Sequence, residues 1–173
     1  LNDYEMASAE QSYPDDSAEE TILYLKSKGI KIGIISRNGS NQLKRAIENF
    51  PQLKWTDFDI VISRDMPLKP KPSNEGVELA MKKLGVDRQN TILVGDYRFD
   101  IQAGNASGVI TVLLHHGDEH DLPQDWKNDY TIYRLKQLKA LLESVLPLAG
   151  GKLPNRFLDK YLKNLDIKDP SLL

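Results

Sequence analysis

The fold is decided by residues 91–100, which read Thr91-Ile92-Leu93-Val94-Gly95-Asp96-Tyr97-Arg98-Phe99-Asp100. Four apolar or β-branched residues in a row predict a short strand of a parallel sheet that is covered on both faces. Sheets of this kind bind ligands just beyond the carboxyl ends of their strands, which is where Asp96 and Asp100 follow. Two carboxylates there indicate a site for a hard cation such as Mg²⁺. The alternative is that Asp96 caps the next helix and Asp100 is a solvated side chain.

The composition is that of an ordinary globular domain. The chain has 173 residues, of which 40% are hydrophobic and 28% charged, and its net charge is −2. Because there is no basic excess, nucleic acid and membrane surfaces are not expected partners. The chain has no cysteine, which excludes disulfides, zinc–thiolate sites and thiol catalysis. No apolar run reaches membrane-spanning length and no signal peptide is visible, so we expect a cytoplasmic protein. The sequence does not indicate its oligomeric state.

Strands and helices are predicted to alternate along the chain. The expected strands are 31–36, 58–62, 91–95, 109–114 and a short one at 130–133, and the expected helices are 17–28, 40–50, 73–84, 101–106 and 135–145. Ser17 and Glu20 have the spacing of a capping box for the first helix. This alternation predicts right-handed crossovers and an α/β fold of three layers, a Rossmann-like parallel sheet with helices on both faces.

Three chemically distinct groups are expected near the carboxyl ends of these strands. They are the hydroxyl of Ser36, the ammonium of Lys69 in a proline-rich loop, and the carboxylates of Asp96 and Asp100. A hydroxyl, a cation and a metal-binding acid suit phosphoryl transfer, in which catalysis is mostly positioning and charge neutralisation. Lys71 competes with Lys69, because it lies two residues further along the same extended loop.

Several other residues are candidates for the same site. Arg37 and Asn38 follow Ser36, where backbone N–H groups at a helix start would bind phosphate, although both are also ordinary turn residues. His115, His116 and His120 lie in a polar loop and are not expected to be metal ligands. Asp57 and Asp59 flank Phe58 in a pattern that imitates a nucleophile motif, but they precede their strand and face its wrong end.

These motifs resemble those of the haloacid dehalogenase (HAD) superfamily, most of whose members are Mg²⁺-dependent phosphohydrolases. The resemblance covers about residues 13–146. It implies that Ser36 binds a phosphoryl oxygen and that Lys69, which begins Lys-Pro-x-Pro at 69–72, is the site lysine. It further implies that in Gly-Asp-x-x-x-Asp, residues 95–100, Asp96 ligates Mg²⁺ and Asp100 supports either the metal or the lysine.

The first motif of that family, Asp-x-Asp at the end of a central strand, is absent from this sequence. In the family its first aspartate forms an aspartyl-phosphate and its second acts as acid and base. Without that strand, two neighbouring strands would carry unpaired backbone groups, each costing about 1–3 kcal/mol. We therefore expect residues upstream of Leu1 to supply the strand and both aspartates, and we expect strands 31–36 and 91–95 not to pair with each other.

The expected organisation follows from this interpretation. Residues 1–12 would be the remnant of a cap or a linker, residues 13–147 the HAD-like core, and residues 148–173 a linker with a helical tail. The expected function is hydrolysis of a small phosphorylated metabolite, and the chain alone is expected to be inactive. The alternatives are a phosphomutase, which would share these motifs, and a binding or scaffold protein that has lost the nucleophile.

Overall fold

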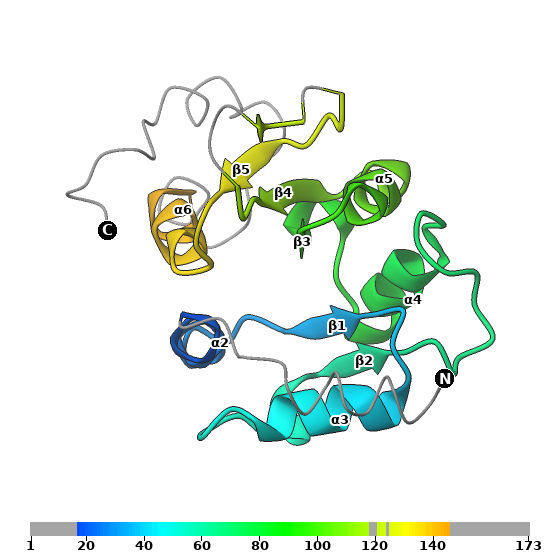
Figure 1. The fold of residues 1–173 in the computed structure, drawn as a ribbon, viewed down its shortest axis with the longest axis vertical. Helices are drawn as coiled ribbons and strands as arrows, with labels where there is room; N and C mark the ends of the chain where they lie inside the picture. The colour runs from blue at the N-terminus through cyan, green and yellow to red at the C-terminus, as the bar shows by residue number, and fades with distance from the viewer. Residues whose placement is uncertain (1–16, 118–120, 124, 146–173) are drawn as a thin grey trace.

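The computed structural model describes residues 17–117, 121–123 and 125–145 (Figure 1). The predicted segments 1–12 and 148–173 lie outside the described residues, and so does His120. The division into cap remnant, core and tail therefore stays a prediction. Among the described residues, no helix is long and apolar enough to cross a membrane.

The first part of the described chain forms a two-stranded sheet with three α-helices and a 3₁₀ helix. Its elements are α2 (Ala18–Ser27), β1 (Gly33–Ile35), α3 (Ser40–Glu48), the 3₁₀ helix η1 (Trp55–Asp57), β2 (Ile60–Ile62) and α4 (Glu75–Leu84). Strands β1 and β2 are parallel, with Gly33 opposite Ile60 and Ile35 opposite Ile62. Such a pair requires a helical crossover, which α3 provides.

The second part forms a three-stranded sheet. Its elements are the 3₁₀ helix η2 (Arg88–Asn90), β3 (Ile92–Gly95), α5 (Arg98–Ser107), β4 (Ile110–Leu114), β5 (Tyr130–Ile132) and α6 (Gln137–Val145). The strand order is β3-β4-β5 and both pairings are parallel. All of the expected strands are present, which confirms the predicted α/β class with parallel strands.

The two sheets meet without a hydrogen-bonded ladder between them. Within the described residues, β1 is an edge of the first sheet and β3 is an edge of the second. All four residues of β3 are only half-buried, whereas Val112 and Leu113 in the middle of β4 are fully buried. As expected from the sequence, strands β1 and β3 do not pair with each other.

Side chains nevertheless join the two parts. Ile35 of β1 and Leu93 of β3 pack against one cluster, whose buried members are Val77, Met81, Ala103 and Val109. A second cluster combines Leu25 of α2 with residues of β4, β5 and α6. Helix α4 also contacts both β1 and α5. The sheets therefore share a hydrophobic core across the boundary.

Two helix starts differ from the prediction. The hydroxyl of Ser17 does not cap α2; it accepts a hydrogen bond from the backbone N–H of Lys136 at 3.1 Å instead. The expected capping box is therefore wrong, because the hydroxyl links α2 to the turn before α6. Helix α5 begins at Arg98, three residues before the expected Ile101, because the Asp100 carboxylate accepts the Tyr97 N–H at 3.2 Å.

Candidate active site

Ser36 lies at the carboxyl end of β1, directly after Ile35. Its backbone N–H donates to the carbonyl of Ile62 at 2.9 Å, which extends the pairing of β1 with β2 by one residue. Its Oγ accepts the backbone N–H of Asn38 at 3.1 Å. The turn therefore holds the hydroxyl at the edge where the strands of both sheets end.

Gly95 permits the close approach of Asp100 to the end of β3. A Cβ atom on Gly95 would lie 2.2 Å from the Asp100 Cβ and 2.5 Å from its Cγ, so only glycine fits there. Asp100 is 7% exposed. One of its carboxylate oxygens accepts the Tyr97 N–H, and the other forms an ion pair with the ammonium of Lys71. Asp100 is thus a buried carboxylate with both oxygens engaged.

Lys71, and not Lys69, reaches this group. Its Nζ also donates to the carbonyl of Ile35 at 3.0 Å, so it joins the residue before Ser36 to Asp100. The side chain of Lys69 is 81% exposed, with Nζ at 3.6 Å from the Glu75 carboxylate. The Lys69 N–H also donates to Glu75 at 2.9 Å. Glu75, at the start of α4, therefore holds Lys69 away from Asp100, and Lys71 is the lysine of this loop that pairs with that carboxylate.

Asp96 is the exposed acid of this edge. The Asp96 carboxylate lies 4.0 Å from Nε2 of His116, and both side chains are more than half exposed. The described residues contain no group of three histidine, cysteine, aspartate or glutamate side chains that could hold a metal ion. Asp96 is an exposed carboxylate that could contribute to such a site, and the described residues alone do not complete one. Asp100 fits its other predicted role, support of the lysine.

Asp65 positions the loop after Ser36, a role that sequence reasoning missed. Its carboxylate accepts the backbone N–H of Ser40 at 2.7 Å and lies 3.3 Å from the Ser63 hydroxyl. The hydrogen bonds from Ser40, and a smaller one from Ser63, hold the pKa of Asp65 below its ordinary value. The sequence feature that could have identified Asp65 is an acidic residue shortly after the end of a strand, in the loop after β2.

Asp57 and Asp59 lie at the opposite edge of the sheet. The Asp59 carboxylate accepts the N–H of Ile32, which precedes β1, at 2.7 Å. Asp57 forms an ion pair with Lys26 and accepts the N–H of Lys54. Both acids are thus engaged at the amino ends of the strands, as the sequence indicated.

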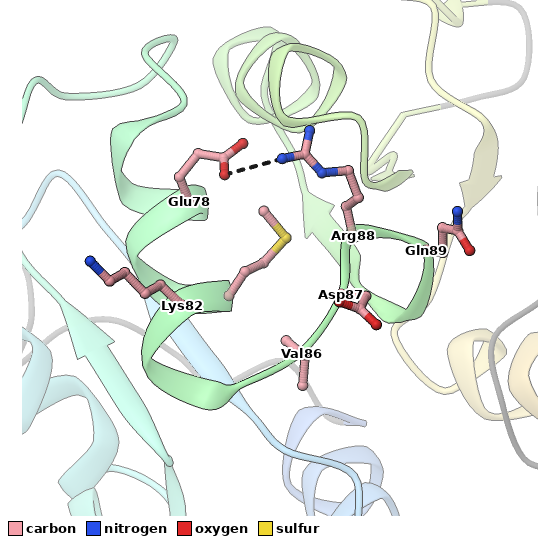
Figure 2. A pocket seen from close by; sticks show the side chains of 7 residues that line it. Glu78, Lys82, Val86, Asp87, Arg88 and Gln89 are labelled. Carbon is pink, nitrogen blue, oxygen red and sulfur yellow. Dashed lines mark ion pairs between the residues drawn. The ribbon is translucent and has the colours of Figure 1, made fainter.

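A surface pocket lies beside α4 and the segment that leads into β3. Its lining residues are Glu78, Met81, Lys82, Val86, Asp87, Arg88 and Gln89 (Figure 2). The Arg88 guanidinium lies 3.6 Å from the Glu78 carboxylate across the pocket. None of the predicted site residues lines this pocket, because it precedes β3 whereas the site follows it.

The family of the chain follows from comparison with known proteins. The model of the haloacid dehalogenase-like hydrolases matches residues 1–114. The chain belongs to the haloacid dehalogenase-like hydrolase family. This confirms the resemblance drawn from the Ser36, 69–72 and 95–100 motifs.

Among its relatives is the "Putative pyrophosphatase PpaX" of Clostridium perfringens, 38% identical over 143 residues, which are 83% of this chain and 54% of that protein. The glyceraldehyde 3-phosphate phosphatase of Methanocaldococcus jannaschii is 28% identical over 73% of this chain and 55% of that protein. This haloacid dehalogenase-like chain therefore spans about half the length of the curated relatives it matches.

A solved structure has the same fold. The crystal structure of a "Putative haloacid dehalogenase-like hydrolase" from Bacteroides fragilis matches with a TM-score of 0.63 and 28% identity. The match covers 71% of this chain and 58% of that one. The Rossmann-like fold expected of the haloacid dehalogenase-like hydrolases is thus confirmed.

Proposed function

We propose that this chain forms the larger part of the core of a Mg²⁺-dependent phosphatase that acts on a small phosphorylated metabolite. The observation that carries the proposal is the position of Lys71, whose ammonium lies between the Ile35 carbonyl and the Asp100 carboxylate, next to Ser36. A hydroxyl and a cation at the carboxyl edge of a parallel sheet are suited to an anion.

In this proposal Ser36 and Lys71 bind the phosphoryl group. The Ser36 Oγ donates to one phosphoryl oxygen while it accepts the Asn38 N–H at 3.1 Å, and the N–H of Arg37 binds the same anion. Lys71 neutralises charge that develops on the equatorial oxygens. Asp100 is a positioning residue, since it is buried and holds the ammonium through an ion pair. Lys71 thus takes the role that the sequence suggested for Lys69.

The metal is the second part of the proposal. Asp96 is an exposed carboxylate at the end of β3, and a hard oxygen ligand of this kind suits Mg²⁺. Because the described residues offer no complete ligand set, we propose that acidic side chains outside them complete the site. Mg²⁺ would supply neutralisation of phosphoryl charge.

The nucleophile is the third part. We propose that a further parallel strand, carrying an aspartate at its carboxyl end, lies between β1 and β3. Support comes from the two edge strands, which do not pair with each other and are only partly buried. A parallel strand between them would bring its carboxyl end beside Ser36 and Asp96. The chain of 173 residues alone is then expected to be inactive.

The substrate class is supported by the relatives, which are named for pyrophosphate and for glyceraldehyde 3-phosphate. Both compounds are small and phosphorylated, so they belong in the first assay panel. A cytoplasmic location, and the absence of nucleic-acid and membrane partners, remain parts of the proposal.

The test is a phosphate-release assay on the complete product of the gene. It uses a panel of phosphorylated metabolites and pyrophosphate, with Mg²⁺ or with a chelator. We expect turnover that requires the metal, and a loss of at least about 100-fold in kcat/KM for Asp96→Asn. The control is Asp87→Asn, which lies in the pocket at the opposite edge. Turnover that survives both the chelator and Asp96→Asn would contradict the proposal.

A further inference from the structure

An aromatic–arginine cluster borders the candidate active site. It consists of Arg37, Tyr97, Arg98, Phe99 and Trp126. Arg37 directly follows Ser36, and residues 97–99 lie between Asp96 and Asp100. Arg37 thus comes from the loop after β1 and residues 97–99 from the start of α5, on either side of the proposed phosphoryl site, whereas Trp126 comes from the segment between β4 and β5.

Its two guanidinium groups lie against one ring. The Cζ atom of Arg37 is 5.8 Å from the Phe99 ring centroid and that of Arg98 is 5.2 Å from it. Both residues are exposed. Within the described residues neither has a carboxylate partner, in contrast to Arg45 and Arg88, which pair with Glu48 and Glu78. Guanidinium groups held by a ring keep N–H groups free to bind an anion.

The aromatic residues support one another. Tyr97 meets the Phe99 ring edge-on at 5.1 Å and the Trp126 ring at 6.0 Å between centroids. Tyr97 is a large side chain that is 52% exposed. Such edge-on pairs stabilise the ring positions. Phe99 is thus a fixed support for two cations at the margin of the site.

We propose that Arg37 and Arg98 bind a second anionic group of the substrate. This inference rests on the proposed function, because Ser36 and Lys71 are taken to hold the phosphoryl group that reacts. The substrate class is then a small phosphorylated compound with a second phosphate or a carboxylate a few atoms away. A phosphate ester of a neutral sugar lacks this group and is expected to bind more weakly.

The test compares three ligands in the complete gene product with Mg²⁺ present. They are orthophosphate, methylenediphosphonate, which is not hydrolysed and carries two phosphonate groups, and phosphonoacetate, which carries one phosphonate and one carboxylate. Isothermal titration calorimetry gives each Kd. We expect methylenediphosphonate or phosphonoacetate, or both, to bind at least about tenfold more tightly than orthophosphate, since charge-assisted bidentate hydrogen bonds are strong. The relative gain of the two ligands distinguishes a second phosphate from a carboxylate.

The variants separate this inference from the proposed function. We expect Arg98→Gln to abolish most of the preference for the doubly anionic ligand while the Kd for orthophosphate stays within about twofold. Arg37→Gln is expected to reduce the same preference. Arg88→Gln and Arg45→Gln are the controls, because their guanidinium groups are paired elsewhere.

Each outcome has one meaning. If the wild type binds none of the three ligands, the proposed function fails. If it binds orthophosphate but neither doubly anionic ligand more tightly, the inference is wrong and the proposed function stands. The inference is also wrong if Arg98→Gln and Arg37→Gln retain the preference. It is wrong as well if both variants weaken the binding of orthophosphate as much as the binding of the doubly anionic ligands.

Discussion

At the scale of single residues, the choice between Lys69 and Lys71 depends on one carboxylate at the start of α4. Both lysines lie in the same extended, proline-rich loop, and the sequence motif favoured Lys69. The Glu75 carboxylate accepts the backbone N–H of Lys69 and forms an ion pair with the Lys69 Nζ. Lys71 then points to Asp100. A motif gives the order of residues, whereas this contact between a loop and a helix depends on the folded path of the chain.

Lys71→Met is expected to remove an ion pair whose side chains are only 16% and 10% exposed. An unpaired carboxylate would remain buried, so the free energy of unfolding should fall by about 3 kcal/mol. In the complete gene product, phosphate release should fall by at least about 100-fold. Urea unfolding and the phosphate assay measure the two effects.

Lys69→Met is the matched control for this prediction, because its ion pair is exposed. It should change stability by less than about 1 kcal/mol and leave turnover largely unchanged. Equal losses in the two variants would mean that Lys71 has no special role.

Gly95→Ala is expected to disturb the site through the position of Asp100. The added Cβ would meet the Asp100 side chain at 2.2 Å, so the start of α5 must shift, at a cost of about 1–3 kcal/mol. Gly29→Ala is the control, since Gly29 has a φ of 70° and nothing within 4 Å of the added atom. Both variants should lose stability, but only Gly95→Ala should weaken orthophosphate binding by calorimetry. Unchanged binding in Gly95→Ala would contradict this account of Asp100.

At the scale of elements, the sequence predicted every strand of the described chain, because each is a short apolar run bounded by turn residues. The boundaries were less accurate. Helix α5 begins earlier than expected because a side chain within its first turn, Asp100, accepts the Tyr97 N–H. The Ser17 hydroxyl accepts a hydrogen bond from the turn before α6 and does not cap α2. Both differences arise from hydrogen bonds that spacing alone does not specify.

Ser107 near the end of α5 gives a prediction about packing. It is fully buried, and in the described part of the chain its hydroxyl has no hydrogen-bond partner. Ser107→Ala should therefore raise the free energy of unfolding by about 1 kcal/mol, because an unsatisfied buried hydroxyl is lost. The matched variant is Ala103→Ser on the same helix, which adds a hydroxyl to a fully buried position and should be destabilising. Urea unfolding measures both, and a less stable Ser107→Ala would mean that the hydroxyl is satisfied.

At the scale of the whole molecule, two carboxylates tie distant segments together in a pH-dependent way. A hydrogen bond from Lys26, and then one from the Lys54 backbone, hold the pKa of Asp57 below its ordinary value. Hydrogen bonds from Ser40 do the same for the pKa of Asp65. A pKa that is lower in the folded state contributes stability above the unfolded value of about 3.9, and this contribution is lost as pH falls through the folded pKa.

Asp57→Asn and Asp65→Asn should therefore be less stable than the wild type at pH 7. The difference should shrink as the pH falls below about 4, where the wild-type carboxylates become protonated. Urea unfolding at a series of pH values measures this convergence. A stability difference that stays constant from pH 7 to pH 3 would show that the charge of these groups is not responsible.

The separation of the described strands into two sheets has a consequence for the behaviour of the chain in solution. An edge strand with free backbone groups is a template for any extended segment, including one from another copy. We expect the 173-residue chain to form concentration-dependent dimers or larger species by exchanging segments at β1 and β3. A short apolar peptide that pairs with both edges should return these species to monomers, which sedimentation would detect.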